Sequence, residues 1–235
     1  MKKLLALAAL WLAGCVEPLP TGTAQPAGPP PVQGPALSPA EADANFFAVV
    51  ARMEPVIERE CAVIRAGDNC DFTIRVDRRP GLPANAMQAL DDTGRPVIAF
   101  TLALIRDARN TDEIAFVMGH EAAHHIAGHI PRQVQSALTG ALIFGALTAA
   151  SGGDDAAIRS AQDIGGTLGA RRFSKEFELE ADTLGTILTW RAGYDPERGA
   201  AFFSRIPDPG NQFLGTHPPH ADRLAAVRRT AAGLR

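Results

Sequence analysis

Four of the six histidines lie within ten residues, in the segment His-Glu-Ala-Ala-His-His-Ile-Ala-Gly-His at positions 120–129. This segment contains the pattern H-E-x-x-H. On a helix, His120 and His124 are separated by a net rotation of about 40°, so both imidazoles face one point. Two nitrogens at this spacing suit one Zn²⁺ ion, and Glu121 flanks the pair without occupying the metal. The spacing predicts a zinc site with a carboxylate base beside it; the alternative is a polar helix with structural histidines.

The two other histidines of this segment are not expected at the metal. On a continuous helix, His129 lies about 180° from His120, and His125 lies about 140° from the ligand stripe. We therefore assign His125 to packing or to the surface. The metzincin pattern requires a glycine seven residues, and a histidine ten residues, after the first histidine. Ala127 and Ile130 occupy these positions, which excludes a metzincin.

An acidic helix further along the chain offers a third ligand. Its core-facing stripe consists of Phe173, Phe177, Ala181, Leu184 and Leu188. Glu178, Asp182 and Gly185 form a second stripe, in which Glu178 could give a carboxylate to zinc and Asp182 could orient a zinc-bound histidine. Gly185 would let another helix approach closely. Taken alone, this pattern is an ordinary acidic helix face, and Glu176 and Glu180 point away from Glu178 toward solvent.

With these residues in place, the sequence resembles the HtpX-like and C-a-a-X-protease-like zinc metallopeptidases, family forty-eight of the metallopeptidases and a group of gluzincins. The resemblance runs from about Phe72 to Arg228 and rests on His120–His124, Glu178–Asp182 with Gly185, and Thr216-His217-Pro218 with Arg223. It points to the periplasmic lipoprotein members, because the chain contains no run of 18 or more apolar residues. It implies an α+β fold, a mainly helical zincin-like domain with a small β-sheet.

The resemblance also implies roles for individual residues. His120, His124 and Glu178 would be zinc ligands, and Glu121 would be the general base. Asp182 and Arg223 would not bind zinc themselves but would contact and orient its ligands.

His217 matches the histidine of the family's T-H-P motif. It would be either a fourth ligand in a self-inhibited resting state or a donor to the oxyanion, and the alternative is an ordinary loop residue beside two prolines. His220 is expected at the surface.

The elements that must position these residues can be outlined from local patterns. Ser38-Pro39-Ala40-Glu41 has the spacing of a capping box and predicts a helix start with an apolar face at Phe46, Phe47, Val50, Met53 and Ile57. Alternating or apolar runs predict strands at 70–76, 86–90 and 96–101, and Asn110 begins the helix that carries the histidines. A peptide substrate would lie along the strand at 86–90 as an added β-strand.

An uncharged Ala/Leu/Gly-rich segment at 137–150 follows the histidines. It is too short to span a bilayer. We expect a core helix or a lid over the active-site cleft; the alternative is a segment that dips into a membrane.

Composition and the N-terminus set the wider context. The chain has 235 residues, of which 46% are hydrophobic and 21% charged, with a net charge of -3 and no long basic run, which argues against a nucleic-acid partner. Residues 1–14 read as a signal peptide, and Leu12-Ala13-Gly14-Cys15 resembles the lipobox of bacterial lipoproteins. This predicts cleavage before Cys15 and lipid attachment to it. The alternative is an ordinary secretory signal with a coincidental cysteine.

The predicted domain organisation follows from this N-terminus. A proline-rich tether at 15–39 would precede a zinc metallopeptidase domain at 40–235. By analogy with enteric bacteria, Val16 favours the outer membrane, so the protein would face the periplasm. In an oxidising compartment, Cys61 and Cys70 are expected to form a disulfide; the alternative is two buried thiols.

Three functions are consistent with these patterns. The first is a lipid-anchored zinc endopeptidase that degrades misfolded or unassembled polypeptides of the bacterial cell envelope. The second is a zinc-stabilised chaperone or assembly factor for outer-membrane proteins, against which the intact Glu121 argues. The third is a latent peptidase held shut by His217.

Overall fold

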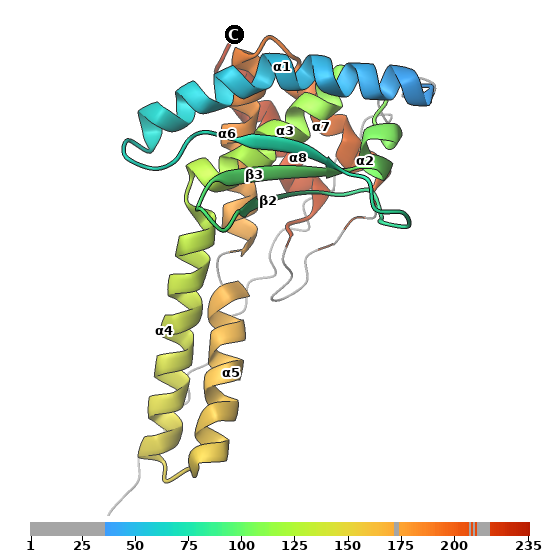
Figure 1. The fold of residues 1–235 in the computed structure, drawn as a ribbon. Coiled ribbons are helices and arrows are strands. Elements are labelled where there is room, and N and C mark those ends of the chain that lie inside the picture. Colours follow the sequence, from blue (N-terminus) through green and yellow to red (C-terminus); the bar gives the residue numbers. More distant parts are fainter. Residues whose placement is uncertain (1–35, 172–173, 207, 209, 211–216) are drawn as a thin grey trace, which may run out of the picture. The chain divides into compact units, whose positions relative to one another are not determined.

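The computed structural model describes residues 36–171, 174–206, 208, 210 and 217–235. The predicted signal peptide, Cys15 and most of the tether, together with Phe173 and Thr216, lie outside these residues. Figure 1 shows the elements in chain order: α1 (Pro39–Ile64), β1 (Thr73–Asp77), β2 (Ala86–Leu90), β3 (Pro96–Thr101), α2 (Leu102–Asp107), α3 (Thr111–Ile126), α4 (His129–Ala150), α5 (Asp155–Arg171), α6 (Ser174–Arg191), α7 (Pro196–Ala200), η1 (Ala201–Arg205) and α8 (His220–Ala232).

The strands form a small mixed sheet in the order β1-β3-β2. Strand β3 lies in the middle, parallel to β1 and antiparallel to β2, and is largely buried. The predicted strands at 86–90 and 96–101 have the observed bounds, and β2 is an edge strand, as expected. Strand β1 begins at Thr73, later than predicted, because the amide of Phe72 donates to the Glu58 carboxylate on α1. The predicted α+β, mainly helical fold is confirmed.

Helix α1 begins as its sequence predicts and packs on the rest of the core. The Ser38 hydroxyl accepts from the amide of Glu41, whose carboxylate accepts from the Ser38 amide, and Pro39 occupies the first turn. Phe46 is buried against Phe100 of β3, with ring centroids 5.2 Å apart, whereas Phe47 is exposed. The expected apolar face is therefore correct except at Phe47.

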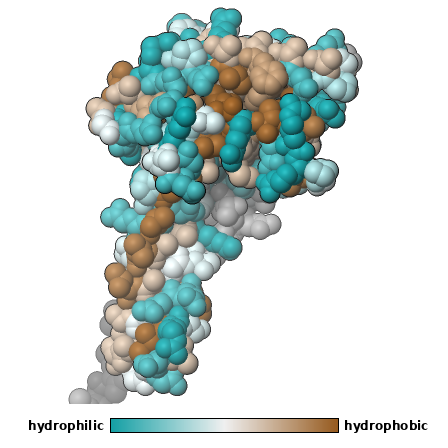
Figure 2. Space-filling model, in the orientation of Figure 1, coloured by the Kyte–Doolittle hydropathy of each residue, from teal (hydrophilic) through white to brown (hydrophobic). Residues whose placement is uncertain are grey.

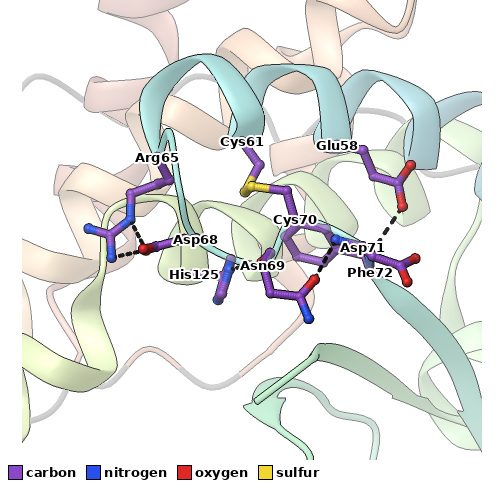
Figure 3. Close-up of a disulfide and its surroundings, with 9 residues drawn as sticks. All are labelled: Glu58, Cys61, Arg65, Asp68, Asn69, Cys70, Asp71, Phe72 and His125. Carbon is purple, nitrogen blue, oxygen red and sulfur yellow. Dashed lines mark hydrogen bonds and ion pairs between the residues drawn. A yellow bond between two sulfur atoms is a disulfide. The ribbon is translucent and has the colours of Figure 1, made fainter. Parts of the chain in front are cut away.

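A disulfide fastens the end of α1 to the loop before β1 (Figure 3). Cys61 and Cys70 are bonded, with their α-carbons 5.6 Å apart, which confirms the predicted pair. The loop between them reaches the zinc-motif helix, since the Asn69 carbonyl lies 2.9 Å from His125 Nε2. Phe72 meets the same imidazole edge to face. His125 is thus a packing residue, one of the two alternatives expected for it.

Helices α4 and α5 pack along each other through glycines (Figure 1). A side chain at Gly140 or Gly165 would collide with the backbone of the other helix. Figure 2 shows apolar side chains gathered along this pair. The exposed large ones on α4 are Val134, Leu138, Leu142, Ile143, Phe144 and Leu147.

The expectation of a core helix or lid at 137–150 is therefore wrong. Only 6% of the most apolar window of α4 is buried, because α5 covers one face with small residues and no other described element covers the outer face. The segment at 137–150, by itself too short to span a bilayer, is part of the longer helix α4, which by length and composition alone is long and apolar enough to cross a membrane.

Candidate metal centre and active site

Helix α3 presents the two histidines of the H-E-x-x-H motif on one face. Its N-terminus is capped by Asn110, whose side-chain oxygen accepts from the amide of Glu113 at 3.0 Å. Glu113 is in turn held by a buried pair of hydrogen bonds from Arg205, at 2.7 and 2.6 Å. These contacts fix the helix that carries His120 and His124, which face each other with Nε2 atoms 3.1 Å apart.

Helix α6 adds a carboxylate to this pair. Glu178 Oε2 lies 3.6 Å from His120 Nε2, and its Oε1 lies 3.4 Å from His124 Nε2. Tetrahedral ligands at zinc distances stand about 3.4 Å from one another. The observed spacings of 3.1–3.6 Å, one to each oxygen of Glu178, therefore fit a metal ion held by two imidazole nitrogens and the Glu178 carboxylate. The structure brings together the three predicted ligands.

A buried ion pair between Asp182 and Arg223 contacts His120 at Nδ1, the ring nitrogen that does not face the other ligands. His120 Nδ1 lies 3.0 Å from Asp182 Oδ1, and Arg223 of α8 binds both oxygens of Asp182, at 2.8 and 2.7 Å. Burial and the Arg223 guanidinium lower the pKa of His120, but its hydrogen bonds to Asp182 and Glu178 outweigh both and raise the pKa to about 9. Metal binding at Nε2 must therefore release a proton from the metal-free site.

His124 has a different environment. Burial, followed by repulsion from His120, lowers the pKa of His124 to about 3, so this imidazole is neutral and its nitrogen is free to bind a cation. Its Nδ1 lies 2.8 Å from Nδ1 of His129. That contact exists because the helix is not continuous. Helix α3 ends at Ile126, Gly128 adopts φ 67° and ψ 37°, and α4 starts anew at His129.

Glu121 lines the same cleft as the three metal-binding residues. Its side chain is partly exposed, and burial raises the pKa of its carboxyl group above the usual value. A carboxylate whose pKa is shifted upward is better matched to accepting a proton near neutral pH. Glu121 thus has the position expected of a base, while its role in catalysis stays a prediction.

Of the two C-terminal histidines, His217 lies at the cleft, as the family resemblance implies, whereas His220 does not lie at the surface as expected. His217 Nδ1 is 3.0 Å from Glu178 Oε2, and the His217 side chain is 54% exposed at the cleft. Burial raises the pKa of Glu178, but hydrogen bonds from His120 and His217 outweigh it and hold that pKa well below its usual range. His220, expected at the surface, is buried against Phe203 with ring centroids 5.9 Å apart, because it begins α8 on the core side.

Two contacts near the metal-binding residues were not expected from the sequence. Glu180 is exposed, as expected, but it also accepts from Arg132 at 2.7 Å and lies 3.2 Å from His129 Nε2. Among the described residues the metal-binding cluster does not include His129, as expected, but His129 contacts the ligand His124, because the helix between them is not continuous. Gly128 is the signal that could have warned of a break, because a glycine there permits a left-handed turn.

The cleft itself has a volume of 580 Å³ and is walled by the edge strand β2. Ala86, Met87 and Gln88 line it together with His120 and Glu121. A second cavity of 660 Å³ adjoins the first and shares Gln88, His124 and Ile130 with it. Val134 and Leu138 of α4 line that second cavity, so the exposed apolar face of α4 begins beside the metal site.

Comparison with known proteins agrees with this site. Residues 50–231 match the model of Peptidase family M48. The beta-barrel assembly-enhancing protease of Escherichia coli K12 is 31% identical over 149 residues, which is 57% of this chain and 30% of that protein.

Two more distant relatives are similar over comparable lengths. The mitochondrial metalloendopeptidase OMA1 of Arabidopsis thaliana is 29% identical over 126 residues, 52% of this chain and 25% of that protein. The metalloprotease LoiP of E. coli is 28% identical over 130 residues, 53% of this chain and 51% of its own length. The matched part thus spans less than a third of the first relative. Since the family match covers most of the chain and includes the His-His-Glu metal site, the chain belongs to Peptidase family M48 and is a metallopeptidase.

Proposed function

We propose that this metallopeptidase is a zinc endopeptidase that hydrolyses misfolded or unassembled polypeptides at the bacterial cell envelope. The observation that carries the proposal is the convergence of His120, His124 and Glu178 at 3.1–3.6 Å on the wall of a cleft that also holds Glu121. Two imidazole nitrogens and one carboxylate are a common ligand set of catalytic zinc, which leaves a position open for chemistry. We therefore assign zinc to this site.

The mechanism assigns proton transfer to Glu121. When bound, zinc would supply Lewis-acid polarisation of the scissile carbonyl and a reactive nucleophile from water at neutral pH. Glu121 would take the proton of the attacking water on its carboxylate and return it to the leaving amine. The upward shift of its pKa by burial suits this exchange, because a group that both accepts and donates works best with a pKa near the operating pH.

The substrate would lie as an extended strand along β2. This strand is an edge of the sheet and lines the cleft, so backbone groups on its outer side are in a position to pair with a peptide. Such pairing uses main-chain groups and tolerates many sequences. An extended substrate requires local unfolding, which favours misfolded or unassembled chains over folded ones.

The cavity beside the cleft supports the same class of substrate. Val134 and Leu138 line it, and the neighbouring Leu142 is 70% exposed, so an apolar surface continues from the metal site along α4. We propose that this surface holds an apolar segment that flanks the scissile bond of the substrate. Apolar segments are exposed in unfolded chains and buried in folded ones, so such a contact would select unfolded substrates.

The cell-envelope location is proposed from the N-terminus. The lipobox-like Leu12-Ala13-Gly14-Cys15 would place a lipid on Cys15 and hold the domain on a tether facing the periplasm. The name of the E. coli relative, beta-barrel assembly-enhancing protease, links that protein to β-barrel assembly, which supports an outer-membrane location for this chain. Replacing Cys15 by Ser should move the protein from the membrane fraction to the soluble fraction, and an unchanged distribution would contradict the anchor.

One assay tests the peptidase proposal. The purified protein should contain about one zinc ion per chain, cleave an unfolded casein, and lose this activity in a chelator. Glu121→Gln should keep zinc but lose activity by at least about 100-fold, as expected for removal of a general base. Equal cleavage by Glu121→Gln and the wild type would contradict the mechanism. If Glu121→Gln still promoted the folding of outer-membrane proteins as well as the wild type, the chaperone function would be favoured instead.

A second candidate function, a latent peptidase, is favoured by one contact. The hydrogen bond of 3.0 Å between His217 and Glu178 ties a partly exposed loop residue to a metal-binding carboxylate. If His217 blocks the site at rest, His217→Ala should raise the rate of casein cleavage. A large loss of kcat with little change in KM would instead assign His217 to the transition state.

A further inference from the structure

A chain of hydrogen bonds connects the metal-binding His124 to the surface of the protein. His124 Nδ1 is 2.8 Å from His129 Nδ1, and His129 Nε2 is 3.2 Å from Glu180 Oε2. Arg132 donates to the same Glu180 oxygen at 2.7 Å. The His129 side chain is buried, so its two ring contacts are fixed by the protein and not by water.

The orientation of the His129 ring is also fixed by packing. The ring stacks on Phe177 of α6, with centroids 4.5 Å apart and an interplanar angle of 9°. The Arg132 guanidinium lies against Phe177 as well, 4.4 Å from its centroid. Phe177 therefore supports two members of the chain of contacts. The left-handed turn at Gly128, with φ 67°, turns the chain so that the His129 ring contacts the His124 ring.

The directions of the hydrogen bonds follow from the metal site. If His124 binds the metal through Nε2, its hydrogen must be on Nδ1, and this N–H can only donate. His129 must then accept at Nδ1, so its own hydrogen is on Nε2 and is donated to Glu180. Every group in the series has one consistent role, with the Glu180 carboxylate as the final acceptor and Arg132 as its charge partner.

The other histidine ligand, His120, is also hydrogen-bonded to a carboxylate, but without a residue between the two. His120 Nδ1 meets Asp182 directly, and Arg223 holds Asp182. Both carboxylates come from α6, where Glu180 and Asp182 follow Glu178 by two and four residues. His129 is the additional residue that lets the more distant Glu180 act on His124.

We propose that His129 is a positioning residue, which together with Glu180 and Arg132 fixes the tautomer and the ring orientation of His124 for metal binding. This inference rests on the proposed zinc site. Groups that orient a metal-binding histidine in this way change metal affinity by about 10–100-fold when they are removed. The contribution is to metal retention, and it can be measured without an assay of catalysis.

The experiment measures the rate at which zinc leaves the full-length protein, using an excess of a chromophoric chelator. His129→Phe retains an aromatic ring against Phe177 but cannot accept from His124, and zinc should leave about 10–100 times faster. His129→Asn, whose side-chain oxygen can accept from His124 and whose amide can donate, should restore much of the retention. The absorption spectrum of the Co²⁺ protein should change in His129→Phe and return toward that of the wild type in His129→Asn.

Matched variants separate the proposed role from general damage. His125→Asn changes the neighbouring histidine, which contacts Asn69, and should leave zinc dissociation unchanged. Glu180→Ala removes the final acceptor at a half-exposed position, so it tests the proposal even if His129→Phe does not fold. Glu176→Ala is its control, an exposed glutamate on the same helix.

The outcomes are distinct. A wild-type protein that binds no zinc would contradict the proposed function itself. If the wild type binds one zinc ion, the inference about His129 is tested separately by His129→Phe and Glu180→Ala. Unchanged zinc dissociation in whichever of these two variants folds would overturn that inference and leave the proposed function standing.

Discussion

Gly185 of α6 lies directly against the backbone of His120 on α3. A β-carbon added at Gly185 would come within 2.8 Å of the His120 nitrogen and 3.0 Å of its α-carbon. Gly119 makes the reciprocal approach, since a β-carbon there would lie 2.9 Å from the Gly185 carbonyl oxygen. The distance between the two helices sets where Glu178 meets the histidines, so the metal site depends on the absence of these side chains.

Gly185→Ala should therefore weaken metal binding as well as stability. The added methyl group must push α6 away from α3, at a cost of about 1–3 kcal/mol in the free energy of unfolding. Thermal unfolding with and without zinc measures both effects, and the stabilisation by zinc should shrink. Gly166→Ala on α5 is the control, because a β-carbon there meets only ordinary contacts at 3.7 Å or more. Equal effects of the two variants would show that the approach of α6 to α3 is not critical.

Asp182→Asn should weaken metal binding and remove the main charge partner of Arg223. Asp182 is fully buried between His120 and Arg223, so the amide keeps the shape but leaves the guanidinium with only Glu178, 3.6 Å away, as a counter-charge. We expect zinc affinity to fall about 10–100-fold. Breaking such a buried pair also costs about 3–5 kcal/mol of stability. Chelator competition and chemical denaturation measure the two losses, and Asp163→Asn on the exposed face of α5 should change neither.

Removal of the disulfide should lower stability through the unfolded state. Cys61 and Cys70 close a short loop, with a sequence separation of 9. Loop-closure entropy for such a loop predicts a loss of roughly 2.5–3 kcal/mol when both cysteines are replaced by alanine. Denaturation of the wild type under reducing conditions should give the same loss. A much smaller value in both cases would mean that residual structure already constrains this loop in the unfolded chain.

Arg205→Met should lower the free energy of unfolding far more than the replacement of an exposed arginine nearby. Arg205 makes two hydrogen bonds with the buried Glu113, and its removal leaves that carboxylate without a charge partner, held only by the Arg109 amide at 2.9 Å. We expect a loss of about 3–5 kcal/mol in the free energy of unfolding. Arg198, which lies 3.2 Å from Asp112 but is 64% exposed, provides the comparison. Arg198→Met should cost no more than about 1 kcal/mol.

Leu138→Asp tests the proposed contact between α4 and the substrate. Leu138 is 61% exposed, so the change should leave stability within about 0.5 kcal/mol. Cleavage of a peptide with an apolar segment beside the scissile bond should slow about tenfold, the effect of losing one buried leucine contact. A peptide with Gly and Ser in that segment should be cleaved at the wild-type rate.

Leu147→Asp is the matched control for this test. Leu147 lies on the same helix and is 63% exposed, but it is nearer the far end of α4 and does not line the cavity beside the cleft. If both variants slowed both peptides equally, the apolar surface would not be a substrate contact. A change in sedimentation or membrane binding in both variants would assign the surface to a second copy or to lipid.

Much of the local structure could be predicted because it depends on neighbours in the chain. The spacing of His120 and His124 requires only a helix, and the capping box of Ser38 and Glu41 defines where α1 begins. The bounds of β2 and β3 follow from apolar patterning around a turn of Asp and Gly. The choice of Glu178 as third ligand needed the family resemblance, because an acidic helix face by itself is common.

The remaining features depend on how distant segments pack. The sequence by itself determined a helix with two histidines on one face and the bounds of two short strands, and it favoured the pairing of Cys61 with Cys70. Tertiary structure alone decided that α6 approaches α3 closely enough for Glu178 to complete the site, and that the break at Gly128 brings His129 back to His124. It also left the apolar face of α4 exposed, because burial depends on which helix packs there and not on composition. Helix periodicity specifies where a side chain points on its own helix, whereas long-range packing specifies what it meets.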